Sequence, residues 1–398
     1  MTAPEAPLTV LDFEDEDDRY HRQTLISWWN QDRLRTATVI VVGAGALGNE
    51  IVKNLALAGV GRIVVLDFDH VENSNLARCV FFREADDGKP KAEVLAARAM
   101  ELNPDIDVIG VVGDVRLTCG LGVLAAADVV IGGLDNREAR LFVNQACWKA
   151  GTPWIDGAIE GLMGVVRVFV PPDSACYECT MNDRDRELVA NRRACSLLTR
   201  DEMLVGRVPT TGTSASVVAG MQAQEAIKLL HADRLGPPAL AGAGYHFVGL
   251  THESYVVHYP RRDDCLSHDR YDLEDAERVG PDTTFGALLT RARARLGDDA
   301  VLELEQELAV AADCSECGHH EAVLRPLVAL TVESATCPRC AHERRLTFTY
   351  VVDASSPLLG LTPAAVGLPP ADVITARVGF TRAAFVTTDR EDPVELLR

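Results

Sequence analysis

A run of β-branched and apolar residues that ends in a glycine turn limits most narrowly how this chain can fold. Residues 38–48 read TVIVVGAGALG, and the segment that follows, NEIVKNLALAGV, carries apolar side chains at helical spacing at Ile51, Leu55 and Ala58. A second apolar run at 62–69, RIVVLDFD, ends in acidic residues. Strand, glycine turn, helix and strand in this order predict a βαβ unit whose two strands lie parallel in one sheet.

Helical and strand-like segments go on alternating up to about residue 160. Residues 91–103 and 137–151 have helical spacing, and residues 106–114, 127–136 and 152–159 are apolar runs typical of buried strands. Alternation of this kind predicts a doubly wound, Rossmann-like α/β fold with a mostly parallel sheet. We assign this fold to residues 1–270.

The remaining sequence divides into segments of different character. A charged segment near 181–209 has no fixed period, and a helix is expected after it because Thr or Ser in the PTTG sequence can cap a helix there. The apolar side chains expected near one face of this helix are Val217, Met221, Ile227 and Leu230. Residues 271–345 read as an acidic, partly helical segment and a zinc ribbon, and residues 346–398 as a β-rich tail.

Composition argues against two classes of partner. Lys and Arg number 39 and Asp and Glu number 59, which gives a net charge of −20. Such a charge repels nucleic-acid phosphates and anionic membrane surfaces. The first twenty residues lack the basic and apolar regions of a leader sequence, and no uncharged apolar stretch is long enough to span a bilayer. We expect a cytoplasmic protein that binds neither nucleic acid nor membranes.

The glycine turn is a candidate phosphate-binding site. Gly43, Gly45 and Gly48 form GxGxxG, a pattern that lets the backbone approach a phosphate at a helix N-terminus. By itself this pattern also fits a dinucleotide fold that binds NAD or FAD. The choice between nucleotides therefore depends on the residues downstream.

Polar and charged residues gather just after the second strand and at the end of a later one. The first group is Asp67, Asp69, Asn75, Arg78 and Lys91. Two clustered cations suit a triphosphate better than a nicotinamide cofactor, and Asp135 in GGLDN could hold Mg²⁺ at a strand end. The alternative is that these residues are ordinary exposed surface charges.

Five motifs follow one another in a fixed order: RYHRQ, GAGALG, LDFDHVENSNLAR, GKPKAE and LDN. Together they resemble the adenylation domain of the ThiF, MoeB and HesA family, which includes the ubiquitin-activating enzymes. The resemblance covers residues 17–268. It implies MgATP as the nucleotide and, as substrate, the C-terminal carboxylate of a ubiquitin-like, β-grasp protein, which attacks the α-phosphorus of ATP.

The resemblance also implies a role for each polar residue of these motifs. The glycine loop would bind ATP and Asp67 the ribose, and Asp135 would bind magnesium. The residues implied to contact phosphates are Asn75, Arg78 and Lys91. Family members are usually dimers in which the arginine matching Arg22 reaches the neighbouring subunit's ATP site, so we expect a homodimer in which Arg22 acts catalytically.

Cys195 distinguishes two kinds of adenylating enzyme. It lies in ANRRACSLLTR, whose arginines would lower the pKa of its thiol. This stretch resembles the family's crossover loop, which in activating enzymes carries the cysteine that takes the acyl group as a thioester. The first interpretation is therefore an activating enzyme that uses Cys195 as a nucleophile. The second is a sulfur-carrier adenylyltransferase of the MoeB or ThiF type without a lasting thioester, in which Cys195 is a passive loop residue.

Two hypotheses that assign the chain to other functional classes stay open. A non-catalytic partner subunit of a heterodimeric enzyme would have lost nucleotide residues that are present here. An NAD-dependent oxidoreductase would prefer NAD to ATP. Residues 271–398 could recruit the modifier, a conjugating enzyme or a target, and their composition does not choose among these.

The eleven cysteines predict two zinc sites. Cys314, Cys317, Cys337 and Cys340 form two CxxC pairs at a spacing typical of a zinc ribbon. A second closed site would consist of the following four residues: Cys176, Cys179, Cys265 and His268. Four protein ligands leave no open position, so both zinc ions should be structural. The alternative is a set of free thiols beside a surface histidine.

Three further cysteines, Cys79, Cys119 and Cys147, fall inside apolar or helical stretches. Free cysteine is among the most frequently buried residue types, so we expect these three to be core thiols.

Overall fold

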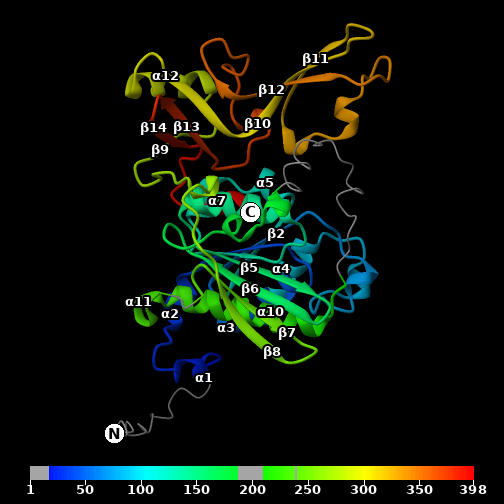
Figure 1. The fold of residues 1–398 in the computed structure, drawn as a ribbon, viewed down its shortest axis with the longest axis vertical. Coiled ribbons are helices and arrows are strands. Elements are labelled where there is room, and N and C mark those ends of the chain that lie inside the picture. Colours follow the sequence, from blue (N-terminus) through cyan, green and yellow to red (C-terminus); the bar gives the residue numbers. More distant parts are fainter. Residues whose placement is uncertain (1–17, 187–208, 238–239) are drawn as a thin grey trace.

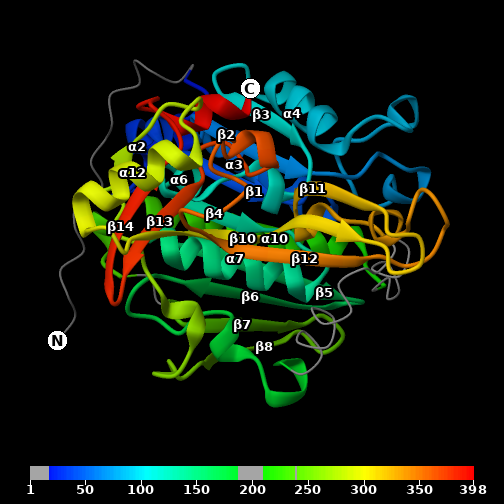
Figure 2. The same ribbon diagram turned by 90° about the horizontal axis from the view of Figure 1, so that it is seen from above.

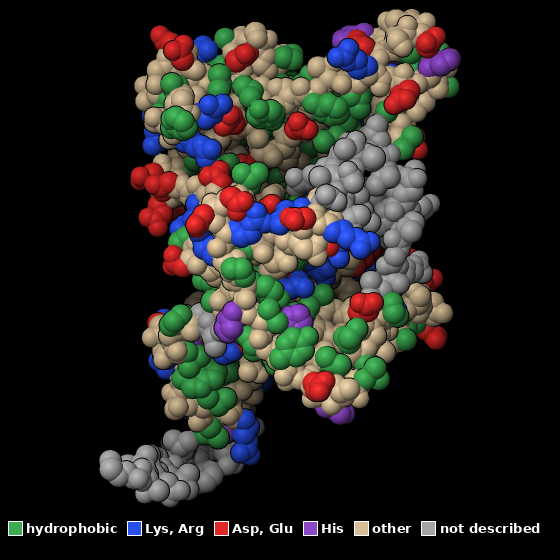
Figure 3. All heavy atoms as spheres, in the orientation of Figure 1, with side chains coloured by type: hydrophobic (Ala, Val, Ile, Leu, Met, Phe, Trp, Pro, Cys, Tyr) green, Lys and Arg blue, Asp and Glu red, His purple; other side chains and the backbone are tan. Residues whose placement is uncertain are grey.

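The structure is a computed structural model that describes residues 18–186, 209–237 and 240–398. Two β-sheets lie one above the other with a layer of helices between them (Figure 1). On the face shown in Figure 3, side chains of both charge signs are interspersed at the level of the helices between the two sheets. None of the helices among the described residues is long and apolar enough to cross a membrane.

The first sheet has eight strands in the order β3-β2-β1-β4-β5-β6-β7-β8. The first five strands in this order are parallel, and β6 to β8 continue the sheet as an antiparallel extension. This arrangement confirms the predicted doubly wound α/β fold. The strands are β1 (Thr38–Val42), β2 (Arg62–Asp67), β3 (Asp107–Val112), β4 (Val129–Gly132), β5 (Trp154–Glu160), β6 (Met163–Phe169), β7 (Ala243–Val248) and β8 (Glu253–His258).

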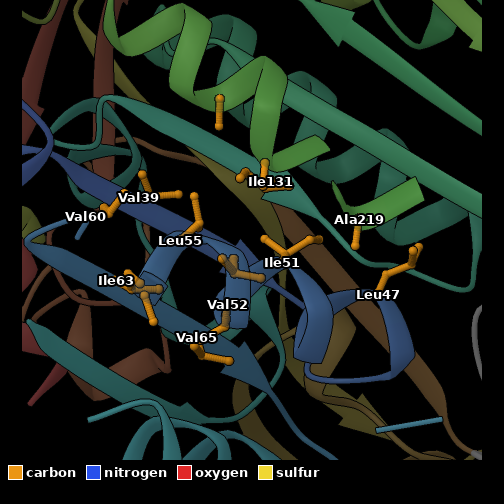
Figure 4. Packing of buried hydrophobic residues seen from close by; sticks show 14 of the residues in the cluster. Val39, Leu47, Ile51, Val52, Leu55, Val60, Ile63, Val65, Ile131 and Ala219 are labelled. Atoms are coloured by element: carbon orange, nitrogen blue, oxygen red, sulfur yellow. The ribbon is translucent and has the colours of Figure 1, made fainter. Parts of the chain in front are cut away.

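Helices cover both faces of this sheet. One face packs against α2 (Gln31–Thr36), α3 (Ala46–Ala58), α4 (Lys91–Leu102) and α10 (Gly212–Leu230). Figure 4 shows the centre of this layer, where Leu47, Ile51 and Leu55 of α3 lie among strand residues such as Val39 and Ile131. The other face packs against α5 (Val115–Thr118), α6 (Leu121–Ala125) and α7 (Arg137–Ala150). Two short helices, α1 (His21–Thr24) and α11 (Ala232–Leu235), lie outside these layers.

The buried face of α10 is only partly the one expected, since Leu230 is buried and Met221 and Ile227 pack against the core as predicted. Thr211 caps the helix as predicted, because its side chain accepts a hydrogen bond from the Ser214 N–H. Val217, however, is exposed, and the residues buried against α3 and β5 are mostly small, such as Ala215, Ala219 and Ala223. Small side chains let two helices approach closely. The face of α10 that is buried is therefore the one that allows a short distance to α3, and not the one with the largest apolar side chains.

The second sheet is built by the C-terminal part of the chain. Its order is β11-β10-β13-β14-β9, and β12 also pairs with β10. Helix α12 (Phe285–Leu296) packs on this sheet and encloses a separate core around Phe285 and Phe385. The strands are β9 (Glu277–Arg278), β10 (Val301–Asp313), β11 (His320–Pro326), β12 (Arg345–Val352), β13 (Val373–Val378) and β14 (Thr381–Val386).

The second sheet lies directly over α6 and α7. Figure 2 shows β10 and β12 crossing above α7, and Lys149 of α7 forms an ion pair of 2.5 Å with Glu305 of β10. Val373 and Val386 belong to the same core as α6 and α7. At Gly122 of α6 a Cβ atom would lie 2.6 Å from the Ala371 oxygen, so glycine permits this close contact. The two sheets therefore share one packed helical layer.

Candidate functional site

The glycine turn between β1 and α3 leaves no room for a side chain at its first and last glycines. Gly43 has a φ of +102°, and a Cβ there would lie 2.7 Å from the Gly133 oxygen. At Gly48 a Cβ would lie 1.9 Å from the Gly43 oxygen. At Gly45, in contrast, no atom lies within 4 Å of the Cβ position. The N-terminus of α3 thus borders an open space, which suits a phosphate group.

Asp67, at the end of β2, is fixed to this loop. One carboxylate oxygen accepts a hydrogen bond of 2.6 Å from the Ala44 N–H, and the other accepts one of 2.7 Å from the Asp69 N–H. Burial raises the pKa of Asp67, and the charge of Lys91 and these two backbone donors oppose that rise. The loop and the carboxylate therefore form one rigid unit.

Lys91 and Arg78 are the two cations that follow β2 in the candidate site. Lys91 is the first residue of α4, and its Nζ lies 3.1 Å from the Asp69 carboxylate. Arg78 donates to the Ser74 oxygen at 2.7 Å. Burial raises the pKa of the nearby Cys79 thiol to about 11, while the positive charges of Arg78 and Lys91 lower it and the negative charge of Asp67 raises it. The three charged groups thus all lie within electrostatic range of this one buried thiol.

Asn75 organises the turn that carries Arg78. Its side-chain oxygen accepts a hydrogen bond of 3.0 Å from the Glu72 N–H, and its backbone oxygen accepts bonds from the N–H groups of Arg78 and Cys79. The N-terminus of α10 also touches this turn, because a Cβ at Gly212 would lie 3.6 Å from the Arg78 Cα.

Asp135 lies in the loop between β4 and α7, next to the glycine loop. Gly133 of this loop contacts Gly43, and its N–H donates to the Val42 oxygen at 2.8 Å. Asn136 caps α7 through a bond of 2.7 Å from the Ala139 N–H. Asp135 itself is exposed, two residues after Gly133, and one of its carboxylate oxygens accepts a hydrogen bond of 3.3 Å from the Asn136 side chain. Hard cations such as Mg²⁺ prefer oxygen ligands of this kind.

The sequence analysis missed a buried ionic group that supports the Asp135 loop. Arg140 donates to the Leu134 oxygen at 2.5 Å, to the Gly157 oxygen at 3.0 Å and to the Asp156 carboxylate at 2.8 Å. The second carboxylate oxygen of Asp156, which is fully buried, accepts a bond of 2.7 Å from Arg167. A single acid inside the apolar strand WIDGAI was the available signal, because a buried charge requires a partner.

Arg22 lies apart from these residues. It is exposed on α1, whose neighbours are the C-terminal ends of α3 and α4: Gln23 donates to the Leu57 oxygen, and Arg19 donates to the Leu102 oxygen. The glycine loop is at the other end of α3, a helix of 13 residues and hence about 20 Å long. The structure therefore does not bring Arg22 into its own chain's site.

The cysteines outside the paired motifs fall into two groups. Cys79, Cys119 and Cys147 are buried, which confirms that they are core thiols, and burial raises the pKa of Cys119 to about 12. Cys195 lies outside the described residues, as does most of the segment near 181–209.

One candidate metal centre joins the α/β domain to the segment that follows it. The Sγ atoms of Cys176 and Cys179 are 3.7 Å apart, Cys265 Sγ lies 3.6 Å from Cys176 Sγ, and His268 Nε2 lies 3.4 Å from Cys179 Sγ. All four ligand atoms are within 4.8 Å of one another. Sulfurs around tetrahedral zinc are expected roughly 3.7 Å apart, given Zn–S bonds of about 2.3 Å. The donor set and its spacing therefore fit Zn²⁺.

The second candidate metal centre is built from two matching turns after β10 and before β12. Cys314 Sγ lies 3.4 Å from Cys340 Sγ, and Cys317 Sγ lies 3.6 Å from Cys337 Sγ. In each turn the first cysteine's N–H donates to a histidine oxygen five residues on, His319 or His342. Four thiols at this spacing also fit a closed, structural zinc site.

Comparison with known proteins identifies the α/β part of the chain. The ThiF family pattern matches residues 20–267, which is more than half of the chain. The SAMP-activating enzyme E1 of Haloferax volcanii is 36% identical over 222 residues, which are 54% of this chain and 75% of that protein. The ThiS adenylyltransferase of Escherichia coli is 34% identical over 216 residues, which are 53% of this chain and 80% of that protein. A sulfur carrier protein adenylyltransferase of Thermus thermophilus is 41% identical over 176 residues, 42% of this chain and 64% of that protein.

Solved structures agree on the fold. The crystal structure of E. coli MccB with ATP superposes with a TM-score of 0.52 at 26% identity, over 65% of this chain and 76% of that chain. The matched family region ends at residue 267, so α12 and the strands of the second sheet lie beyond it.

Proposed function

Because the chain belongs to the ThiF family, we propose that it uses MgATP to adenylate the C-terminal carboxylate of a ubiquitin-like, β-grasp protein. The observation that carries the proposal is the open glycine loop at the N-terminus of α3, which is hydrogen-bonded to Asp67, with Lys91 paired to the adjacent Asp69. The relatives described above support this class of reaction, since they are adenylyltransferases of sulfur carrier proteins or activating enzymes of ubiquitin-like proteins.

In this proposal the protein supplies positions and charges rather than covalent chemistry. The substrate carboxylate attacks the α-phosphorus, the bond from that phosphorus to the bridging oxygen breaks, and pyrophosphate leaves. The α3 N–H groups, Arg78 and Lys91 offset the negative charge of the phosphates, and Asp67 holds the ribose. Asn75 contacts the phosphates and shapes the turn that presents Arg78. Asp135 would hold Mg²⁺, which supplies further positive charge.

The finer proposal is a second step at Cys195. The Cys195 thiolate attacks the acyl carbon of the adenylate, AMP leaves, and the modifier becomes a thioester. Arg192, Arg193 and Arg200 in the sequence support this role, because nearby positive charge increases the thiolate fraction.

A sulfur-carrier adenylyltransferase is the second candidate. The names of the Thermus and E. coli relatives favour it. In that case the adenylate passes to a sulfur donor and no lasting thioester forms on the enzyme.

Two structural features are part of the proposal. A homodimer would explain why Arg22 lies far from its own chain's glycine loop, because Arg22 could then serve the neighbouring subunit. Two zinc ions would close the Cys₃His and Cys₄ centres. The assignment of residues 1–270 to adenylation and the cytoplasmic location stay predictions.

The deciding experiment is intact mass measurement under non-reducing conditions. The protein is mixed with MgATP and a candidate β-grasp protein, and wild type is compared with Cys195→Ala. An ATP-dependent, thiol-labile adduct of one modifier mass that is absent from the variant supports the activating enzyme. An adenylated carrier without an enzyme adduct supports the sulfur-carrier reading, and the absence of any adenylation despite ATP binding contradicts both.

A further inference from the structure

Asn49 is a fully buried polar residue in the first turn of α3, and the proposed reaction assigns it no role. Its side-chain amide donates to the Ala44 oxygen at 2.8 Å and to the Gly45 oxygen at 3.1 Å. Its side-chain oxygen accepts a hydrogen bond of 3.0 Å from the Phe81 N–H. One side chain thus joins two separate stretches of backbone.

In the proposed function, both stretches belong to the part of the site that contacts phosphates. Ala44 and Gly45 belong to the glycine loop, and Phe81 closes the turn that carries Arg78. That turn is anchored by the buried side chains of Cys79, Phe81 and Phe82. Its outer residue, Arg78, is partly exposed. The position of the Arg78 backbone relative to the loop therefore depends on what fixes Phe81.

Hydrogen bonds to both backbone groups of Ala44 fix the glycine loop. The Ala44 N–H donates to Asp67, and the Ala44 oxygen accepts from Asn49. Neither bond uses the N–H groups of the α3 N-terminus that face the open space at Gly45. The loop can therefore be rigid and still offer donors to a phosphate.

We propose that Asn49 is a positioning residue that sets the distance between the glycine loop and Arg78, so that both contact the phosphates of one bound nucleotide. This inference rests on the proposed function, because it requires ATP in the site. Asn49 touches no reacting atom and acts through Arg78 and the loop. A misplacement of about 1 Å among such groups reduces function by up to roughly 100-fold.

The chain offers a matched control at Asn103. Asn103 is also fully buried, its amide donates to the Tyr20 hydroxyl and the Ala56 oxygen at 2.8 and 2.6 Å, and its oxygen accepts from the Asp105 N–H at 3.2 Å. It lies at the C-terminal end of α4, whereas Lys91 lies at the other end. Its loss should cost similar stability without affecting the nucleotide site.

The test is the affinity for MgATP, measured by calorimetry on the whole chain. Wild type, Asn49→Ala, Asn103→Ala, Arg78→Ala and the Asn49→Ala/Arg78→Ala double variant are compared, with melting temperatures recorded for each. We expect Asn49→Ala to weaken binding about 10- to 100-fold and Asn103→Ala to leave it within twofold. If Asn49 acts through Arg78, its replacement should cost less in the Arg78→Ala background.

Each result has a distinct meaning. Equal MgATP affinity in wild type and Asn49→Ala, or an equal loss in Asn103→Ala, overturns the inference, and so does full additivity in the double variant. Failure of wild type to bind MgATP overturns the proposed function instead. If Asn49→Ala does not fold, Asn49→Ser takes its place, since its short hydroxyl cannot bridge both stretches and the same weakening is expected.

Discussion

Arg62 and Asp392 form an ion pair although 330 residues separate them in the sequence. Arg62 begins β2 in the first sheet, and it also lies 3.3 Å from the carboxylate of Glu395. Val394 and Leu397, from the same C-terminal turn, are buried in the core that surrounds α6 and α7. The end of the chain therefore belongs structurally to the α/β domain, although the intervening strands form the second sheet.

Because the C-terminal turn packs against the α/β domain, we predict that Val394→Ala destabilises this domain. Val394 is 1% exposed, and truncating a buried aliphatic side chain costs about 2 kcal/mol. The free energy of unfolding, measured by urea denaturation, should fall by that amount. Phe380→Ala is the control, because Phe380 is fully exposed at the turn between β13 and β14 and should change stability little. Equal stability of the two variants would contradict the burial of the C-terminal turn.

The parallel core could be predicted from sequence because local and long-range signals agree there. TVIVV is apolar and β-branched and pairs with strands on both sides as β1, and the glycines that follow it permit a turn that other residues cannot make. β10 shows the opposite case. VLELEQELAVAAD is rich in Leu, Glu and Ala, which favour helices, yet it forms a 13-residue strand because its pairing with β11, β12 and β13 outweighs local propensity.

The residues of the candidate site that could be predicted are those whose type and spacing indicate their chemistry. The residues that could not be predicted are those whose role depends on contacts with groups far away in the sequence. Asp67, Lys91 and the CxxC pairs stand out by type and spacing, and the structure brings Lys91 near Asp67 and each set of metal ligands together. Asn49 and Arg140 have common residue types in ordinary helical positions. Their importance comes from backbone groups at distant positions, such as Phe81 N–H and Gly157 oxygen, which sequence spacing does not place beside them.

Metal analysis should find two zinc ions per chain in wild type. Cys179→Ser and Cys317→Ser each remove one ligand from a different centre, and each variant should lose one ion because a closed structural site needs all four ligands. Inductively coupled plasma mass spectrometry measures the stoichiometry. Cys79→Ala serves as the control and should retain both ions, since Cys79 belongs to neither centre. A wild type with no bound zinc would contradict both assignments.

The two cysteine turns predict a reciprocal pair of stability changes. Gly318 and Ala341 follow the second cysteine of their turns and both adopt left-handed backbone conformations, with φ of +66° and +60°. This conformation costs a residue with a Cβ roughly 1–2 kcal/mol. Ala341→Gly should therefore raise the melting temperature, and Gly318→Ala should lower it although the space for a Cβ is open there. Shifts in the same direction for both variants would show that φ is not the cause.

The buried carboxyl group of Asp372 leads us to predict that the protein loses stability as the pH rises. It is buried where the second sheet meets α6, and one of its carboxylate oxygens faces the Leu121 N–H at 3.5 Å. Burial, together with the negative charge of Glu305, raises the pKa of Asp372 to about 7, although the Val373 and Leu121 N–H groups and Lys149 oppose the rise. The pKa of Asp372 in the folded state is thus above its value of about 3.9 in the unfolded state. At pH values between these two, the folded state binds a proton that the unfolded state does not.

The sign of the effect follows from this difference. The stabilising contribution of protonated Asp372 is complete below about pH 4 and is lost as the pH rises to about 7, with an upper limit of about 4 kcal/mol. Urea unfolding at pH 5.5 and pH 8 should show a smaller pH dependence for Asp372→Asn than for wild type, because the amide stays neutral. Asp32→Asn, at a side chain that is 87% exposed, is the control and should leave the pH dependence unchanged. If Asp372→Asn retains the full pH dependence of wild type, the titrating group lies elsewhere and the carboxylate at the sheet boundary is ionised throughout this range.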